Sequence, residues 1–382
     1  MILTKGQEQG LKTCVERYRN REIYTVIAGY AGTGKTTLIQ YVIAALGLSD
    51  KEVAYVAYTG KATNVLKKRG CANAMTAHQL LYDSIPKGDG TFFHKPKRHL
   101  PNYKLIVVDE ISMLPKEMWD LLVTHRIHVI ALGDPAQLPP IGEDNCLLSK
   151  PHVFLDEVMR QEEGSEIIRL TMDIRAGKQL VPFKGEQVQV LRKKDFFNNM
   201  LLWPDQVIVG YNRTRQHLNK TMRLLLYGTD DPEPIVGDRL ICLKNNWEIA
   251  NENQDLMMNG TVGILTKKYP VFLFKDTQFI RIDFLPDGLE NNSYNNFTSI
   301  FTDYQLLLTG EKTINPNNWK KFKTLNVSEF DYAYAITCHK AQGDEYEKVL
   351  VFEEKLKSDQ HQRWLYTAAT RAKNKLVIIL DN

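Results

Sequence analysis

The chain has 382 residues, of which 43% are hydrophobic, and its formal net charge is +4 at pH 7. This length suggests roughly two to three domains, with a core that needs neither disulfides nor metals. So mild a basicity does not by itself indicate nucleic acid, because basic residues can be concentrated on one face while others balance them.

The cysteines and the N-terminus point to the cell interior. No two cysteines lie within three residues of each other, which argues against a zinc site or a disulfide framework: Cys14, Cys71, Cys146, Cys242 and Cys338. The N-terminus turns polar at once and has no signal-peptide core. Apolar stretches such as 41–48 are too short to span a bilayer. We therefore expect a soluble, cytoplasmic protein with no membrane partner.

Apolar runs of strand length alternate with helix-like segments in two regions of the chain. In the first region the runs are Tyr24–Ala28, Val53–Tyr58, Leu105–Val108 and His128–Leu132. In the second they are Gln206–Val209, Tyr332–Thr337, Val349–Phe352 and Leu376–Leu380. This alternation predicts an α/β fold with parallel sheets that helices cover on both faces.

Two stretches break this rhythm. Residues 82–103, rich in Lys, Pro, Gly and His, predict a hairpin or loop that projects from the first α/β region. Residues 232–329 instead favour β-structure and predict a small antiparallel barrel inserted into the second region. Its strand-like runs are Ile235–Leu243, Thr261–Thr266, Val271–Phe274 and Phe279–Phe284, and we expect the Asn-rich piece Asn291–Phe297 to be a loop.

The segment Gly29–Thr36 matches the phosphate-loop pattern GxxxxGK[ST], after a strand-like run and before a helix-like run, Thr37–Leu46. Backbone N–H groups and the helix N-terminus suit phosphates, Lys35 reaches the β- and γ-phosphates, and the hydroxyl of Thr36 ligates Mg²⁺. A chance glycine-rich turn is the alternative, which the flanking strand and helix disfavour. The predicted ATP contacts are Gly29, Gly32, Thr33, Gly34, Lys35, Thr36 and Thr37.

Two carboxylates, Asp109 and Glu110, directly follow the strand-like run Leu105–Val108. The carboxyl ends of strands are where open α/β sheets bind ligands. We expect Asp109 to hold Mg²⁺ and Glu110 to polarise the attacking water, which favours hydrolysis over transfer to a substrate hydroxyl. Gln137, in the segment 133–140, could sense the γ-phosphate or position the water. Solvated turn acids and a Pro/Gly-rich turn are the structural alternatives.

The order of these blocks resembles superfamily 1 helicases, and in detail their 5′→3′ branch, the RecD/Dda-like superfamily 1B with its phage-type members. The resemblance extends from residue 2 to about 380. The blocks that carry it are Gly29–Thr36, Tyr58–Thr63, Thr76–Leu81, Asp109-Glu110, Gly133–Gln137, Met159–Gln161, Gly210–Asn219, Ala335–Gly343 and Tyr366–Arg371.

The resemblance implies two RecA-like parallel-sheet domains with a hairpin insertion in the first and an SH3-like β-barrel insertion in the second. Val236–Lys244 and Met258–Gly263 resemble that barrel. The implied boundaries are 1–81 and 104–152 for the ATP-binding domain 1A, 82–103 for a wedge insertion 1B, 153–231 and 330–382 for domain 2A, and 232–329 for the barrel 2B.

The resemblance also assigns roles around ATP. Gln7 would contact adenine, while Gln342 and Gly343 would link the nucleotide to nucleic acid. Arg160 and Arg371 would reach the γ-phosphate across a cleft that closes when ATP bridges the two α/β domains, and such an arginine can contribute roughly 10³–10⁵ in rate. The expected catalytic set is Lys35, Glu110, Gln137, Arg160 and Arg371, with Thr36 and Asp109 on the metal.

Residues that could grip a strand carry hydroxyl, amide or backbone groups at loop ends, which contact phosphates without sequence preference. They are Thr59, Gly60, Thr76, His78, Asn212, Thr337 and His339. His78 alone would otherwise be interpreted as a structural or helix-capping histidine. Phe92 and Phe93 could form a wedge at a duplex fork or could equally anchor their own loop. Basic clusters at 67–69, 95–98, 192–194 and 320–323 could line a strand path or be solvated faces.

The expected function is an ATP-dependent DNA helicase that moves 5′→3′ on single-stranded DNA and separates duplex strands. Its partners would be single-stranded DNA and duplex or fork DNA, with a single-strand-binding or replication protein as a further candidate, in a bacterial or phage-infected cytoplasm. The alternatives are a P-loop kinase or signalling NTPase, an RNA-directed superfamily 1 helicase, and a single-strand translocase that does not unwind.

Overall fold

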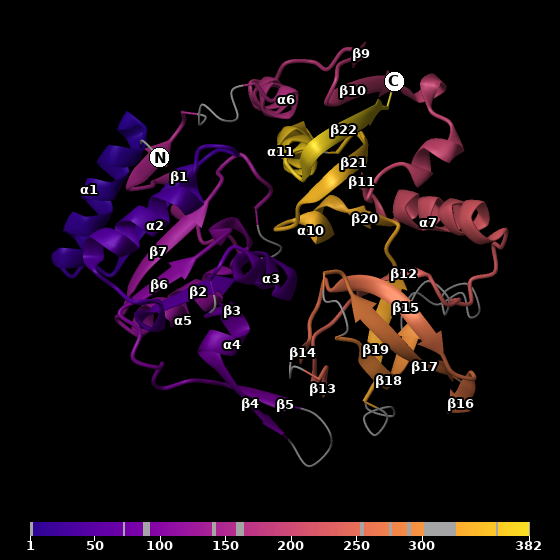
Figure 1. Cartoon of the computed structure of the whole chain (residues 1–382), viewed down its shortest axis with the longest axis horizontal. Helices are drawn as coiled ribbons and strands as arrows, with labels where there is room; N and C mark the ends of the chain where they lie inside the picture. Colours follow the sequence, from indigo (N-terminus) through magenta and orange to yellow (C-terminus); the bar gives the residue numbers. More distant parts are fainter. Residues whose placement is uncertain are drawn as a thin grey trace. The chain divides into compact units, whose positions relative to one another are not determined.

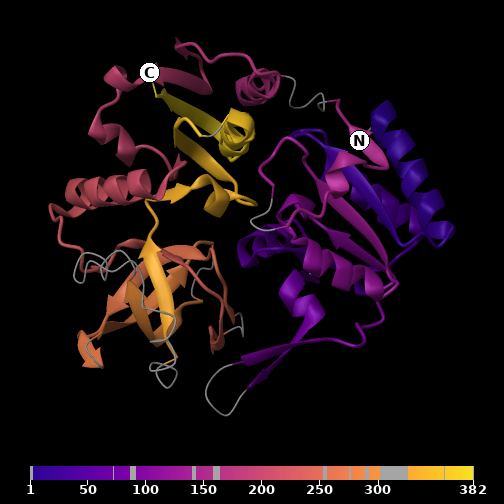
Figure 2. The same cartoon turned by 180° about the vertical axis from the view of Figure 1, so that it is seen from behind.

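The computed structural model describes residues 3–71, 73–86, 92–139, 143–157, 164–252, 256–274, 277–288, 292–301, 326–356 and 358–381. The chain forms two compact units. The first contains residues Met1–Asp83, Pro96–Phe196 and Ala341–Asn382, and the second contains Ser84–Lys95 and Phe197–Lys340. Figures 1 and 2 show the elements of both units from opposite sides.

The first unit contains a six-stranded sheet with the order β3-β2-β6-β7-β1-β8. All neighbouring strands in it run parallel. The strands are β1 (Tyr24–Gly29), β2 (Val53–Ala57), β3 (Ala74–Thr76), β6 (Leu105–Val108), β7 (His128–Gly133) and β8 (Val153–Leu155). The four predicted runs are thus confirmed. The edge strands β3 and β8 were not predicted, because three residues are too few to show a pattern.

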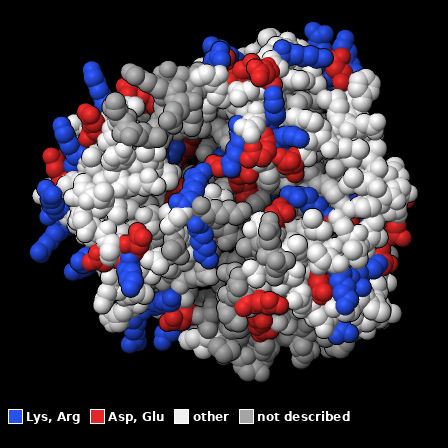
Figure 3. Space-filling view, in the orientation of Figure 1, with Lys and Arg blue, Asp and Glu red and all other residues white. Residues whose placement is uncertain are grey.

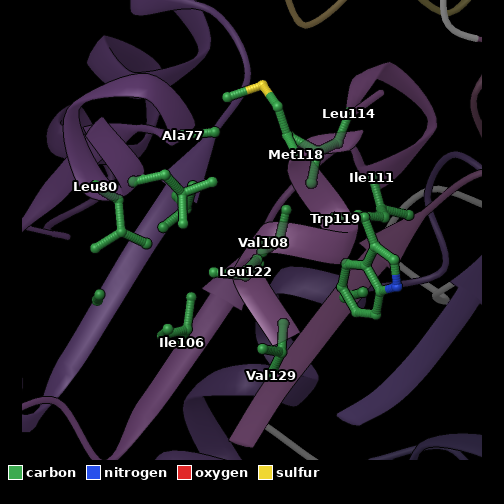
Figure 4. Close-up of a cluster of buried hydrophobic side chains, with 14 of the residues drawn as sticks. Ala77, Leu80, Ile106, Val108, Ile111, Leu114, Met118, Trp119, Leu122 and Val129 are labelled. Atoms are coloured by element: carbon green, nitrogen blue, oxygen red, sulfur yellow. The ribbon is translucent and has the colours of Figure 1, made fainter. Parts of the chain in front are cut away.

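Helices cover both faces of this sheet, and the strands alternate between two hydrophobic clusters. Leu105 and Val107 of β6 belong to one cluster, whereas Ile106 and Val108 belong to the other. Figure 4 shows the second cluster, in which Trp119 is one of the largest side chains. Helices α1 (Lys5–Arg19) and α2 (Lys35–Leu46) supply the first cluster, and α4 (Ala77–Leu81) and α5 (Lys116–Thr124) supply the second.

Four further strands belong to the first unit: β9 (Phe183–Lys184), β10 (Val188–Arg192), β21 (Tyr346–Phe352) and β22 (Ala372–Leu380). β22 pairs in parallel with β21 and β10, and β9 pairs antiparallel with β10. Helices α6 (Glu166–Arg175) and α11 (Ser358–Ala369) pack against each other and against β22. β21 and β22 begin earlier than predicted, because exposed polar residues near the start of each strand, such as Glu347 and Lys373, interrupt the apolar run.

The second unit contains a closed five-stranded barrel with the order β15-β12-β19-β18-β17, which a β15–β17 pairing closes. Phe279, Phe284, Phe301 and Phe330 are fully buried in its core. The strands are β12 (Arg239–Cys242), β15 (Val262–Lys268), β17 (Thr277–Pro286), β18 (Tyr294–Phe301) and β19 (Ser328–Tyr332), with β16 (Phe272–Phe274) paired to β17. The predicted barrel is confirmed.

Two details of the barrel differ from the prediction. The pair β18–β19 runs parallel, so the barrel is not wholly antiparallel. The predicted loop Asn291–Phe297 contains the start of β18 at Tyr294. Tyr294 and Phe297 are buried, but two exposed asparagines separate them, and Asn296 has a left-handed φ of 49°. This irregular step breaks the two-residue alternation that marks a strand.

The run Tyr332–Thr337 was predicted as one strand but forms two. β19 ends at Tyr332 in the barrel, and β20 (Ala335–Thr337) pairs in parallel with β11 (Gln206–Val209). The side chain of Asn219, in α7 (Asn212–Tyr227), fixes the break: its Nδ2 donates to the carbonyl of Tyr332 at 3.0 Å, and its Oδ1 accepts from the N–H of Ala335 at 2.7 Å.

The predicted hairpin is confirmed as the two-stranded sheet of β4 (Tyr82–Pro86) and β5 (Phe92–Pro96). Parallel sheets, hairpin and barrel together give the predicted fold class. No helix within the described ranges is both long and apolar enough to cross a bilayer. The remaining elements are α3 (Gly60–Lys68), α10 (Cys338–Ala341), β13 (Asn246–Ala250), β14 (Leu256–Met257), η1 (Asp50–Glu52), η2 (Ile111–Met113), η3 (Leu147–Ser149), η4 (Lys193–Asp195) and η5 (Asn198–Leu202).

Candidate nucleotide site

The phosphate loop joins β1 to α2. A Cβ on Gly29 would lie 2.7 Å from Oγ1 of Thr33 and 3.0 Å from Cβ of Leu155, so only glycine fits there. Gly34 caps α2 with a left-handed φ of 73°. The Nζ of Lys35 donates to the carbonyls of Gly29 at 2.8 Å and Tyr30 at 3.0 Å. The lysine therefore lies over the loop, whose N–H groups and helix N-terminus suit an anion.

Gln7 is 1% exposed and joins the start of α1 to this loop. Its Oε1 accepts from the N–H of Thr4 at 3.0 Å, as part of a capping box, and its Nε2 donates to the carbonyl of Thr33 at 3.1 Å. The predicted adenine contact would use the remaining Nε2 hydrogen. In this structure the residue contacts the phosphate loop itself.

The two carboxylates follow β6 as predicted. Burial raises the pKa of the Asp109 carboxyl, and the charge of Lys35 partly opposes this rise. Burial also raises the pKa of Glu110, with Arg371 opposing and Asp109 adding to the rise. Glu110 has a left-handed φ of 50°, a conformation that costs a non-glycine residue about 1–3 kcal/mol and is typical of functional sites. For both carboxyls, the nearby cations therefore do not fully offset the cost of burying the negative charge.

Thr36 and Asp109 line one cavity of about 340 Å³. Its other walls come from apolar side chains of α2, from one residue each of β2, β6 and β7, and from the end of α3 with the residues Arg69, Gly70 and Cys71 that follow it. A hydroxyl and a carboxylate are hard oxygen donors, and Mg²⁺ commonly takes one or two protein oxygens while keeping several waters. The predicted metal residues therefore fit this ion. The described residues contain no group of three or more His, Cys, Asp or Glu side chains that could hold a metal.

Gln137 lies in the loop that follows β7. The residue is 6% exposed, and its buried Oε1 has no hydrogen-bond partner among the described residues. A buried polar atom without a partner costs about 1–3 kcal/mol, so its presence calls for an explanation. A water beside Gln137 that donates an O–H to this oxygen would provide one.

Arg371 lies just after α11 and is 4% exposed. Its guanidinium donates to the carbonyl of Thr367 at 3.0 Å, to the carbonyl of Asp344 at 3.2 Å and to the hydroxyl of Thr370 at 3.0 Å. Its charge acts on Glu110. Arg371 and Glu110 therefore belong to one electrostatic environment within the first unit.

Gln342 and Gly343 also belong to the first unit. The Nε2 of Gln342 donates to the carbonyl of Leu138 at 3.1 Å, in the loop of Gln137. A Cβ on Gly343 would lie 3.2 Å from Cβ of Ala62 and 3.8 Å from Oγ1 of Thr59, so this glycine lies close to the start of α3. The first unit therefore brings the two residues together with the Gln137 loop and with one of the predicted strand contacts.

Several predicted strand contacts are occupied in local structure. Thr59 and Thr76 cap α3 and α4, and each accepts a backbone N–H at 3.2 Å. Thr76 is 1% exposed, so capping accounts for its hydroxyl. The ring of His78 lies near two aromatic rings, with its centroid 6.1 Å from that of Tyr58 and 5.9 Å from that of Tyr82. Gly60 is the first residue of α3 and directly follows the capping residue Thr59.

In the second unit, Asn212 begins α7 and its Oδ1 accepts from Arg215 at 3.2 Å. Thr337 ends β20, and burial lowers the pKa of His339 in α10.

Lys and Arg side chains are interspersed with Asp and Glu on the face in Figure 3, in keeping with the net charge of +4. Arg160, the 320–323 cluster and the side chains of Phe92 and Phe93 lie outside the described residues.

Sequence reasoning missed three residues that shape this site. Tyr366 and Thr367 lie in a recognised block but had no assigned role, and both bind the Gln137 loop. The guanidinium of Arg175 stacks on Tyr30 of the phosphate loop. The two α11 residues could have been suspected from their block, whereas no pattern connects Arg175 with residue 30.

Residues 2–200 match a family described as AAA domain, and residues 332–379 match one described as UvrD-like helicase C-terminal domain. The chain is 25% identical over 268 residues to the ATP-dependent DNA helicase Dda of Enterobacteria phage T4, covering 63% of this chain and 60% of that protein. It is 26% identical over 379 residues to the ATP-dependent RecD2 DNA helicase of Deinococcus radiodurans, covering 92% and 46%. The chain thus spans less than two thirds of both relatives.

The fold is similar to that of a Pif1 helicase from Bacteroides, whose structure was solved in complex with ADP-AlF3 and single-stranded DNA. The TM-score is 0.56 at 18% identity, and the match covers 100% of this chain and 93% of that one. At this identity the likeness concerns the fold.

Proposed function

Because the chain belongs to the AAA-domain family, and within helicase superfamily 1B to the Pif1/RecD/Dda-like group, we propose that it is an ATP-dependent DNA helicase. We further propose that it moves 5′→3′ on single-stranded DNA and separates the strands of forked duplexes. The relatives that support this are named as DNA helicases, and the Pif1 neighbour was solved with single-stranded DNA.

The observation that carries the proposal is the grouping of nucleotide-site residues in one compact unit. The phosphate loop with Lys35, the carboxylates Asp109 and Glu110, the unpaired oxygen of Gln137 and the guanidinium of Arg371 all lie there. This set contains a phosphate cradle, a base and an arginine, the parts that NTP hydrolysis uses. A kinase would need an acceptor site instead.

In the proposed reaction, ATP is the substrate and water is the nucleophile. Glu110 accepts the proton as the water oxygen bonds to the γ-phosphorus and the bond to the bridging oxygen breaks. Gln137 orients the water through its free Oε1, while Lys35 and Arg371 balance the charge on the phosphate oxygens. Thr36 and Asp109 would hold Mg²⁺, which supplies Lewis-acid charge neutralisation when bound.

Motion would follow from closing and opening of the nucleotide site, as two RecA-like domains bind and release ATP. We propose the boundaries 1–81 with 104–152 for the first domain and 153–231 with 330–382 for the second. The insertions are then 82–103 and 232–329. Arg160 would act with Arg371, and Gln7 would contact the base. Strand contacts would come from Thr59, Gly60, Thr76, His78, Asn212, Thr337 and His339.

One experiment tests the function directly. The ATPase rate is measured with no nucleic acid, with single-stranded DNA and with single-stranded RNA of the same sequence. Unwinding is then measured on duplexes that carry only a 5′ or only a 3′ tail. We expect DNA stimulation and unwinding from the 5′ tail. Stimulation by neither polymer would refute the helicase, stronger stimulation by RNA would refute the DNA substrate, and preference for the 3′ tail would refute the polarity.

A further inference from the structure

Helix α11 and the segment before β21 bind the Gln137 loop at both ends. At its start, the Tyr366 hydroxyl donates to Oδ2 of Asp134 at 2.6 Å. At its end, the N–H of Leu138 donates to Oγ1 of Thr367 at 2.9 Å, and the carbonyl of Leu138 accepts from Gln342 at 3.1 Å. The side chain of Gln137 therefore projects from a loop whose ends are both held by the C-terminal part of the first unit.

The Tyr366 hydroxyl has a second partner, because its oxygen accepts the N–H of Ala31 in the phosphate loop at 3.1 Å. One buried oxygen thus joins the phosphate loop to Asp134. The tyrosine is 2% exposed and Asp134 is 1% exposed, so water does not compete for these bonds. Burial, reinforced by the Asp134 carboxylate, raises the pKa of Tyr366, which keeps the hydroxyl protonated and able to donate.

Asp134 uses its other oxygen within the loop. Its Oδ1 accepts the N–H of Ala136 at 2.9 Å, and its carbonyl accepts the N–H of Gln137 at 3.2 Å. The carboxylate therefore holds the turn that presents Gln137, while the tyrosine holds the carboxylate. If the tyrosine hydroxyl were removed, one oxygen of a buried carboxylate and one loop N–H would each lose a partner.

The same helix also holds the guanidinium of Arg371 in position. The carbonyl of Thr367 accepts the Nε of Arg371 at 3.0 Å, and its hydroxyl accepts the N–H of Leu138. A single residue thus contacts both the arginine and the glutamine loop. Any displacement of α11 would move the two groups together, relative to the phosphate loop that Tyr366 also contacts.

We propose that Tyr366 is a positioning residue for ATP hydrolysis, which sets Gln137 through Asp134 and ties α11, with Arg371, to the phosphate loop. This inference rests on the proposed ATPase activity. Tyr366 acts through other groups, so its loss should slow turnover while ATP still binds. Thr367 supports the same loop from its other end.

The test compares Tyr366→Phe with Tyr334→Phe as the matched control. Tyr334 is also a buried tyrosine whose hydroxyl donates to a buried aspartate, Asp238 at 2.9 Å, but it belongs to the second unit, whereas the nucleotide-site residues belong to the first. Steady-state ATPase is measured with saturating single-stranded DNA. We expect Tyr366→Phe to lower kcat about tenfold to hundredfold, as for loss of a hydrogen bond to a buried charge, with KM for ATP changed less than about threefold. The control should keep its kcat.

A double-variant cycle with Asp134→Asn separates positioning from general damage. If Tyr366 acts through Asp134, the double variant should be no slower than the slower single variant. Three results would each overturn the inference. They are losses in kcat that multiply in the double variant, a kcat equal to wild type in Tyr366→Phe, and a change confined to KM. Thr367→Val should also lower kcat, and it keeps the test decisive if Tyr366→Phe does not fold. A wild-type chain without DNA-stimulated ATPase would refute the proposed function instead.

Discussion

The guanidinium carbon of Arg175 lies 3.5 Å from the centroid of the Tyr30 ring, so a cation from α6 stacks on the second residue of the phosphate loop. The same ring makes an edge-to-face contact with Phe154, with centroids 5.3 Å apart and an interplanar angle of 84°. The Tyr30 carbonyl accepts from Lys35 at 3.0 Å and from Thr33 at 2.9 Å. The stacked tyrosine therefore anchors two side chains of the loop.

Arg175→Ala should weaken ATP binding, because the loop loses an interaction worth about 0.5–2 kcal/mol and becomes less preorganised. We expect KM for ATP to rise about threefold to tenfold, with a smaller change in kcat. Arg169→Ala is the control, since Arg169 lies on the same helix and its guanidinium donates to the carbonyl of the exposed Gly164 at 3.0 Å. Equal effects of the two changes would contradict a role for the stack.

Lys35→Ala should abolish ATP hydrolysis, because the loop loses the ammonium that binds the β- and γ-phosphates. Glu110→Gln should still bind ATP but turn over about 10²–10⁴-fold more slowly, as expected when a general base is removed. Nucleotide binding is measured by calorimetry and turnover by phosphate release. Near-normal turnover in either variant would refute the assigned chemistry.

The pH dependence of kcat should report Glu110. Burial raises its pKa, so the carboxylate that accepts the proton forms only at a pH above the ordinary carboxyl range of about 4.3. The rate should therefore fall on the acid side at a higher pH than an ordinary glutamate would give. A profile measured at saturating ATP tests this. A rate that stays constant down to about pH 5 would exclude a raised pKa at the base.

Asp109→Asn should stabilise the nucleotide-free chain while it abolishes turnover. The pKa of Asp109 is raised in the folded state, so the folded chain loses stability as the pH rises from the unfolded pKa through the folded one. At about pH 8 the charge is destabilising, and its removal should raise Tm by about 2–4 °C.

The stability gain in Asp109→Asn should shrink in acid, where the wild-type carboxyl is already protonated in the folded state. Asp120→Asn serves as a surface control, because Asp120 is exposed and forms an ion pair with Lys116 one helical turn before it. A gain of the same size at every pH would show that the effect is not electrostatic.

Phe92→Ala and Phe93→Ala test the wedge. If either ring separates strands, its variant should keep DNA-stimulated ATPase but lose most unwinding on a forked duplex. Val181→Ala is the control, because it removes an apolar side chain that is 65% exposed in the first unit. Equal loss of ATPase and unwinding would instead assign the phenylalanines to folding of the hairpin.

The sequence predicted the central strands of both α/β regions well, because buried parallel strands are almost continuously apolar. It did not predict β18, where Asn295 and Asn296 interrupt the alternation. It also joined the end of β19 to β20, because the residues from Tyr332 to Ile336 are all apolar and carry no mark of the break between the two sheets. Asn219, which holds the break open, lies more than a hundred residues away.

The sequence by itself determined the phosphate loop, the carboxylates after β6 and the order of the family blocks, because each depends on residues adjacent in the chain. The tertiary structure alone decided which of these groups act on one another. The bonds from Tyr366 to Ala31 and Asp134 span 335 and 232 residues. Hydrogen bonds and stacking contacts act over a few ångströms, so they depend on how the fold brings distant segments together.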